Sequence, residues 1–201
     1  MLEGSLAFIR SELLSYLNND IQDGEVEVVL GNIALFETEN ANAINERIVI
    51  TLVNIEEEST LKNSRNVHYG LDGGVRYTAQ PIFLNLYLLF SCNYNSYSTA
   101  LQRLSNIIRF FQQRRKFDIK SASGEQNENT FQEQEKEFKL IFELYTLTFE
   151  QINHLWGALG GRQLPSVMFK ARLVKIEDSS IFKQGPPIQE VQGNSSLFNE
   201  Y

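Results

Sequence analysis

The chain has 201 residues, with 18 Lys or Arg against 25 Asp or Glu, so its net charge is −7. This length fits one domain of ordinary size. The single cysteine, Cys92, excludes an intramolecular disulfide, and the Cys and His spacing offers no zinc cage. Stability must therefore come from a packed core, and an intracellular setting is expected.

Charge and hydropathy exclude further classes of protein. The acidic balance argues against general nucleic-acid binding, which needs a basic surface. No uninterrupted apolar run reaches the roughly 20 residues of a membrane helix. Glu3, Arg10 and Glu12 interrupt the N-terminal stretch that a signal peptide would need. We therefore expect a soluble protein that does not use the usual export signal.

The N-terminal half predicts one helix and several strands. Apolar residues spaced by three or four over residues 2–17 predict a helix that lays one apolar stripe on a sheet. Residues 47–55 and 82–90 are apolar on both alternating faces, which is typical of interior strands; the second is the best candidate for the centre. A shorter strand is predicted at residues 26–30. Residues 60–80 predict either a mobile loop or a hairpin with Asp72 and Gly73 at its tip.

The C-terminal half predicts two more helices and two more strands. Ser98 is placed to cap a helix with one apolar face, made by Ala100, Leu101, Leu104, Ile107, Ile108 and Phe111. Residues 120–136 are polar enough for an exposed loop. Thr148 begins a second helix, with Gln151 placed as in a capping box, and Gly160 and Gly161 stop it. The strands are predicted at residues 138–145 and 167–176.

These elements predict an α/β (α+β) fold. Helices and strands are interspersed rather than strictly alternating, which favours a mixed β-sheet with helices packed on it over a doubly wound parallel sheet. Residues 1–178 form the predicted single domain, and residues 179–201 a polar C-terminal tail.

A search for catalytic, metal and cofactor groups gives little. His68 and His154 have no partner in the sequence pattern, and Cys92 follows the most apolar strand, where an inert buried thiol is expected. The glycine clusters lack the spacing of a phosphate-binding loop. We therefore predict no catalytic residue, metal or cofactor. The alternative is a small-ligand-binding or hydrolytic α/β domain whose site combines Glu58, His154 and Arg162.

Charged and aromatic positions suggest an interaction surface instead. The acidic run Glu56–Glu58 follows the strand at 47–55, and a solvated strand end is the expected role. The functional alternative is an ion pair between this run and the basic cluster Arg114–Lys116 of another subunit. Trp156 lies on the apolar stripe of its helix and is expected in the core, with an interface role as the alternative. The candidate subunit-interface residues are Glu56, Glu57, Glu58, Arg114, Arg115, Lys116, Trp156 and Arg162.

Four segments carry a resemblance to a known family. They are LVNIEEESTLKN at 52–63, PIFLNLYLLFSCNYNSYSTAL at 81–101, IIRFFQ at 107–112 and LWGALGGRQLPSVMFKARLV at 155–174. In this order they resemble the tail-terminator or cap proteins of extracellular contractile injection systems. Such systems are phage-tail-like particles of the antifeeding-prophage and virulence-cassette type. The resemblance covers roughly residues 2–178.

The resemblance implies a structural role without catalytic residues. Family members form a six-fold ring at the end of the tail away from the baseplate, where the ring closes the inner tube and holds the last sheath layer. The implied partners are other copies of the chain, the inner tube protein and the sheath protein. The implied location is the cytoplasm during assembly and the particle afterwards.

Overall fold

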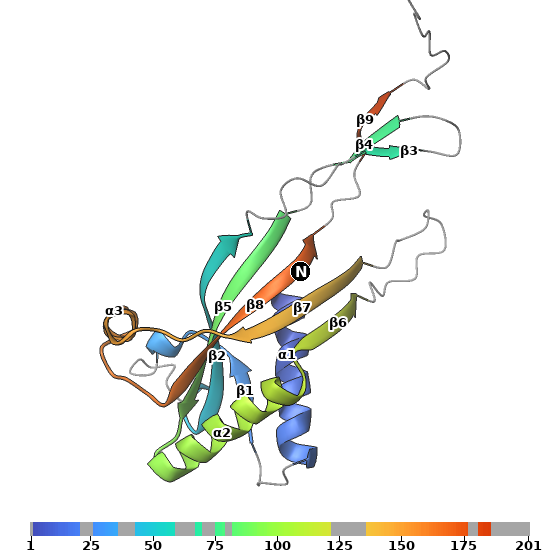
Figure 1. The fold of residues 1–201 in the computed structure, drawn as a ribbon. Helices are drawn as coiled ribbons and strands as arrows, with labels where there is room; N and C mark the ends of the chain where they lie inside the picture. Colours follow the sequence, from blue (N-terminus) through green and yellow to red (C-terminus); the bar gives the residue numbers. More distant parts are fainter. Residues whose placement is uncertain are drawn as a thin grey trace, which may run out of the picture.

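A computed structural model describes residues 2–20, 26–35, 43–58, 67–69, 75–78, 82–121, 136–176 and 181–185 (Figure 1). The helices in these ranges are α1 (Leu2–Ser15), α2 (Tyr97–Gln113) and α3 (Phe149–Ala158), with a π-helical turn at Tyr16–Asp20 and a 3-10 turn at Ile33–Leu35. The main sheet contains, in spatial order, β1 (Val28–Leu30), β2 (Arg47–Glu57), β5 (Ile82–Asn93), β8 (Ser166–Ile176), β7 (Lys136–Leu144) and β6 (Lys116–Ser121).

The main sheet is mixed, as the sequence predicts. β1 runs parallel to β2, and every other neighbouring pair in this sheet is antiparallel. β5 lies between β2 and β8, which confirms residues 82–90 as a central strand. Its apolar residues on both faces are explained by helices on both faces of the sheet.

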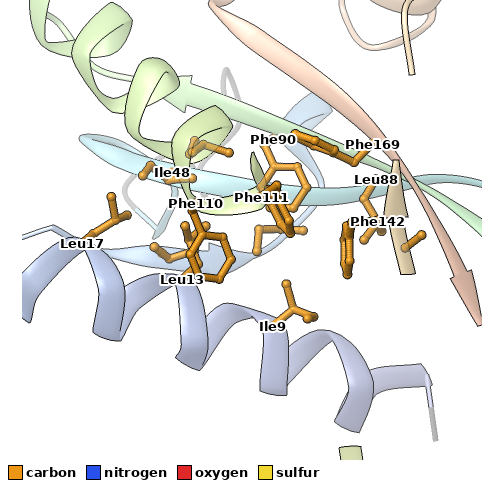
Figure 2. Close-up of a cluster of buried hydrophobic side chains, with 14 of the residues drawn as sticks. Ile9, Leu13, Leu17, Ile48, Leu88, Phe90, Phe110, Phe111, Phe142 and Phe169 are labelled. Carbon is orange, nitrogen blue, oxygen red and sulfur yellow. The ribbon is translucent and has the colours of Figure 1, made fainter. Parts of the chain in front are cut away.

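One face of the main sheet is covered by α1 and α2 and holds the larger core. Ile9, Leu13 and Leu17 of the N-terminal helical segment point into it, as the predicted stripe requires (Figure 2). Phe111 of α2 is the centre of an aromatic cluster, with its ring centroid 4.5 Å from that of Phe142 and 4.4 Å from that of Phe169. Aromatic pairs at these distances add to the free energy of apolar burial.

The opposite face carries α3 and a smaller core. Trp156 of α3 is 4% exposed and is buried with Ile33, Ile44, Val49, Leu89 and Met168. The predicted capping box is present: the Thr148 hydroxyl accepts the Gln151 N–H, and the Gln151 side chain accepts the Thr148 N–H at 2.9 Å.

The predicted glycine stop of α3 is also confirmed. Gly160 and Gly161 have φ values of 107° and 81°, and the Gly161 N–H donates to the Trp156 carbonyl at 2.6 Å. This six-to-one bond is the Schellman motif, in which glycine avoids the cost of a left-handed backbone.

Three predictions need correction or extension. The cap of α2 is Ser96, not Ser98, because the Ser96 hydroxyl accepts the Thr99 N–H at 3.3 Å and the helix begins at Tyr97. Strand β6 was not predicted, and Lys116 is its first residue. Leu101 and Ile108 were predicted on the apolar face of α2, but both are exposed. The sheet buries only one side of the helix, which carries Ala100, Arg103, Ile107 and Phe111.

A second, three-stranded sheet holds β3 (Val67–Tyr69), β4 (Val75–Thr78) and β9 (Ile181–Gly185), in the order β3-β4-β9. It lies beyond the ends of β5 and β8 in Figure 1. β3 and β4 pair as an antiparallel hairpin, which confirms the hairpin alternative for residues 60–80, although its tip lies outside the described residues. β9 falls within the predicted C-terminal tail, and residues 186–201 and the predicted loop at 122–135 also lie outside the described residues.

Candidate functional site

Within the described residues, the main sheet has an open edge beside β1, because that strand is much shorter than its neighbour. β1 pairs with only residues 48–50 of β2. The chain then turns away at Gly31, whose carbonyl accepts the Thr51 hydroxyl at 2.7 Å, and the Thr51 oxygen also accepts the Ile33 N–H at 3.2 Å. Thr51 thus satisfies backbone groups that a longer strand would have paired.

A notch of about 550 Å³ lies at this open edge, and we call it the β2 notch. Most of its lining is apolar: Leu6, Leu30, Gly31, Asn32, Ile50, Thr51, Leu52, Val53, Leu155, Ala158 and Leu159. Helix α3 contributes Leu155 and Ala158, and Leu159 is its C-terminal cap, so the notch lies beside the C-terminal part of that helix.

A larger groove opens on the other side of α3, where β7 leaves β8. The last hydrogen bond between these segments runs from the Tyr145 N–H to the Met168 carbonyl at 2.9 Å. The first residues of β8 therefore form the edge of the sheet there. The resulting α2–α3 groove has a volume of about 710 Å³ and is lined by Leu89, Tyr97, Leu101, Leu104, Ile108, Leu144, Tyr145, Thr146, Leu147, Ile152, Leu155, Trp156, Gln163, Leu164, Pro165, Ser166, Val167 and Met168.

Large apolar side chains around the α2–α3 groove are exposed to solvent. Tyr97 is 67% exposed and Leu144 59%, and Leu101 and Ile108 are also exposed. Phe149, the first residue of α3, is 88% exposed. Tyr97, Leu101, Ile108 and Leu144 therefore place exposed apolar side chains along one groove, which is a candidate interaction surface.

The acidic run at the end of β2 is held on β5. Glu56 accepts a hydrogen bond from the Tyr87 hydroxyl at 2.6 Å, and Glu58 accepts one from the Asn85 amide at 3.0 Å. The pKa of Tyr87 is raised to about 12, mainly by the hydrogen bond to Glu56 and secondly by burial of the hydroxyl group. Glu57 opposes Leu84 and lies on the other face of the sheet, so the three carboxylates do not converge, as alternation along a strand requires.

The basic cluster is divided among three environments. Arg114 caps α2, forms an ion pair with Glu12 of α1 and lies over the Phe117 ring at 4.7 Å. Arg115 lines a smaller groove of about 430 Å³, and no ion pair within the described part of the chain involves its side chain. Lys116 starts β6 and is exposed. Arg114 therefore links two segments of one subunit, whereas Arg115 contributes to the lining of a groove.

The smaller groove continues the α2–α3 groove. The two share Ile108 and Leu144, and the smaller one is otherwise lined by Phe111, Gln112, Arg115, Phe142, Glu143 and Phe169. Glu143 forms an ion pair with Arg172 of β8 at 3.2 Å. Arg115 is therefore the cation at one end of a long apolar surface that follows α2.

The alternative ligand site does not assemble in these grooves. Glu58, His154 and Arg162 are absent from the lining of all three grooves described above, namely the α2–α3 groove, the β2 notch and the smaller groove. His154 and Arg162 are exposed. Among the described residues, no group of three His, Cys, Asp or Glu side chains could hold a metal ion.

Cys92 is buried in the core, and burial raises the pKa of its thiol to about 12. A thiol in this state is a poor nucleophile, as expected from the sequence. No helix of the described residues combines the length and the apolar character needed to cross a membrane.

The apolar residues around the grooves were not predicted as a functional surface. The available signal was the width of the α2 stripe, in which Leu101 and Ile108 stand next to Ala100 and Ile107. A stripe of that width exceeds what one sheet covers, so part of it must face another element or solvent. The exposure of Phe149 has no comparable signal in the sequence.

Comparison with known proteins gives the family. The family described as the Pvc16 N-terminal domain matches residues 7–190. No curated protein matches the sequence. Two cryo-EM structures share the fold. They are the sheath/tube terminator of the extracellular contractile injection system PVC in its extended state, and the tube-terminating cap of the anti-feeding prophage.

The structural agreement extends over the whole chain. The PVC terminator aligns with a TM-score of 0.60 at 13% identity, over 100% of this chain and 65% of its own. The anti-feeding prophage cap aligns with a TM-score of 0.61 at 13% identity, over 96% of this chain and 60% of its own. The chain thus spans less than two thirds of either relative. The resemblance found in the sequence is confirmed, and the chain belongs to the Pvc16 N-terminal domain family.

Proposed function

We propose that the chain is a structural cap subunit of a contractile injection system. In this role it ends the inner tube and anchors the last sheath layer, at the end of the particle away from the baseplate. The observation that carries the proposal is the coverage of the fold: nearly all of the chain aligns with the terminators of two different particles.

The distribution of chemistry in the subunit supports a role in assembly. Its single thiol is buried, the described lining of the α2–α3 groove contains no charged side chain, and the exposed Tyr97, Leu101, Ile108 and Leu144 line that groove. Surfaces of this composition bind other proteins through shape and apolar burial rather than through a reactive group.

A ring of identical subunits is the arrangement that we propose for the cap, with six copies as the family resemblance implies. A closed ring needs two different, complementary patches on each subunit, because each copy meets its neighbours head to tail. The β2 notch and the α2–α3 groove lie on different sides of α3 and are different in shape and lining. The tube and the sheath are the further partners, and assembly in the cytoplasm precedes incorporation into the particle.

The experiment is deletion of the gene in the organism that encodes the particle, followed by electron microscopy of purified particles. Overlong or unstable tubes are expected, with normal length restored when the 201-residue chain is supplied in trans. Particles of unchanged length and stability in the deletion strain would contradict the proposal.

A further inference from the structure

The first residues of β8 form a sheet edge that is open toward the α2–α3 groove. On the β5 side, the Cys92 N–H donates to the Pro165 carbonyl at 2.9 Å. Backbone groups of successive strand residues point to opposite edges, so those of Ser166 and Met168 point away from β5. There, the Tyr145 N–H donates to the Met168 carbonyl. The N–H and carbonyl of Ser166 and the N–H of Met168 therefore have no strand partner in the described part of the chain.

Apolar side chains stand on both sides of this open edge, which is a template for a further strand. Leu101 and Ile108 of α2 lie on one side, and Ile152 and Trp156 of α3 on the other, all in the lining of the α2–α3 groove. Successive side chains of a strand point to opposite faces, so an added strand directs alternate side chains to α2 and to α3. The groove therefore fits an extended segment with apolar residues at successive positions.

The charges around the groove define the segment further. The described lining of the α2–α3 groove contains no Asp, Glu, Lys, Arg or His. A charge buried there would lack a partner, so the segment is uncharged where it lies beside β8. The smaller groove, which continues from Ile108 and Leu144, is lined by the cation Arg115, and its acidic residue Glu143 is paired with Arg172. An acidic residue at the end of the segment that reaches the smaller groove is therefore complementary to it.

We propose that an extended segment of a partner protein adds to β8 as a new edge strand in the α2–α3 groove. The segment is apolar at successive positions, uncharged beside β8 and acidic at the end near Arg115. Its backbone pairs with Ser166 and Met168, and its side chains cover Leu101 and Ile108, which are exposed in the subunit. The proposal rests on the proposed cap function and names the kind of segment that a partner in the particle contributes. The added strand then forms part of the surface that the chain presents to its ring neighbours.

A random peptide library selected on the immobilised 201-residue chain supplies the probe. Enriched sequences are expected to hold about five consecutive uncharged, mostly apolar residues, with Asp or Glu at one end. Leu101→Lys places a charge in the groove and is expected to raise the dissociation constant of an enriched peptide by about tenfold or more, measured by fluorescence polarisation. Gln113→Lys is the matched control, because it adds the same charge on the exposed surface of α2 outside the groove, and it should leave binding unchanged. Thermal unfolding of each variant shows that it is folded.

Methylation of the peptide's backbone nitrogens tests whether it binds as a strand. In a strand, the N–H groups of alternate residues face one neighbour, so only one alternate set pairs with β8. The peptide N-methylated on one set is expected to lose binding, and the peptide methylated on the other set is expected to keep it.

The acidic end is tested by coupling it to Arg115. Arg115→Gln is expected to weaken binding of a peptide with a terminal Glu severalfold, and to have no effect on the same peptide with Gln in that place. An equal effect on the two peptides would overturn the assignment of the acidic end.

Several results would overturn the strand proposal. They are the absence of enriched sequences, equal effects of the two methylation sets, and equal binding by the Leu101→Lys and Gln113→Lys chains. Enriched sequences that match this chain itself would make a second copy the occupant, which also contradicts the proposal.

Failure of the strand proposal is distinguishable from failure of the cap function. If no peptide binds while the deletion strain makes overlong tubes, the cap function stands and its partners dock elsewhere. If peptides bind as expected but tube length is normal without the gene, the groove contact stands and the cap function is wrong.

Discussion

The two faces of the main sheet use similar apolar side chains for different purposes. The face under α1 and α2, which we call the closed face, holds the larger core, and its aromatic cluster around Phe111 is buried apart from its contribution to the lining of the smaller groove (Figure 2). The face under α3 has a smaller core around Trp156 and is flanked by the β2 notch and the α2–α3 groove. The closed face provides stability, and the flanks of the other face leave apolar surface for partners.

Unequal strand lengths produce this difference. A single ten-residue helix, α3, covers one face, whereas α1 and the 17-residue α2 cover the other. β1 ends early on one side of α3, and β7 departs early on the other. The open edges next to α3 follow from these early ends.

The largest expected effect is at the closed face. Phe111→Ala removes the ring that contacts Phe90, Phe142 and Phe169, and should lower the free energy of unfolding by about 3–5 kcal/mol. Phe149→Ala is the matched control, because Phe149 is 88% exposed, and its effect should stay within about 0.5 kcal/mol. Urea unfolding measures both. Similar losses for the two variants would contradict the contrast between a closed face and an open flank.

A smaller effect is expected at the start of α3. Thr148→Ala removes the hydroxyl that accepts the Gln151 N–H and should cost about 1 kcal/mol of stability. Thr146→Ala, an exposed threonine of the groove two residues earlier, should leave stability nearly unchanged. If denaturant unfolding gives equal midpoints for both variants, the cap does not hold α3 on the sheet.

Two glycines of the α3 region should respond with opposite signs. A methyl group at Gly157 meets no atom within 4 Å, so Gly157→Ala should raise stability by about 0.5–1 kcal/mol by favouring the helix. Gly161 has equal space but a φ of 81°, so Gly161→Ala should lower stability by about 1 kcal/mol. Thermal unfolding compares the stability of the two variants. A gain in stability in both would mean that Gly161 can be replaced without backbone strain.

The smallest effect near neutral pH concerns Tyr87. Its pKa is raised from 10.0 to about 12, so its contribution to stability is complete below pH 10 and is lost as the pH rises from 10 towards 12. The stability difference between wild type and Tyr87→Phe should therefore shrink over this interval. Unfolding measured at several alkaline pH values checks it, with Tyr97→Phe as the control for loss of an exposed tyrosine. A constant difference would show that the bond to Glu56 is not present in solution.

The sequence predicted the parts of the fold that have strong local signals. The helix over residues 2–17, the central strand, the capping box at Thr148 and the glycine stop all have side-chain patterns that act within a few residues. The cap of α2 was misplaced by two residues because Ser96 and Ser98 offer the same hydroxyl. Strand β6 has only two apolar residues, Phe117 and Ile119, and its pairing with β7 makes it a strand.

The residues that line the grooves could not be predicted, because their positions depend on contacts between distant parts of the chain. The acidic and basic runs are visible in the sequence, but the ion pair between Arg114 and Glu12 joins residues that are 102 positions apart. The exposure of Leu144 depends on where β7 leaves β8, which is a property of the assembled sheet. The predicted interface residues Trp156 and Arg162 stay predictions, with the indole buried in the subunit and the guanidinium group exposed.

The buried thiol of Cys92 has a practical consequence. It is the single cysteine of the chain, and it lies on the central strand under α2 with no exposed surface. A thiol reagent therefore reacts only with molecules whose core has opened, and the rate of labelling reports that opening. Because the native chain already carries this thiol, no substitution is needed, and the same reaction can compare the free subunit with the assembled form that we propose. Slower labelling in the proposed assembly would measure how much it protects the subunit against unfolding.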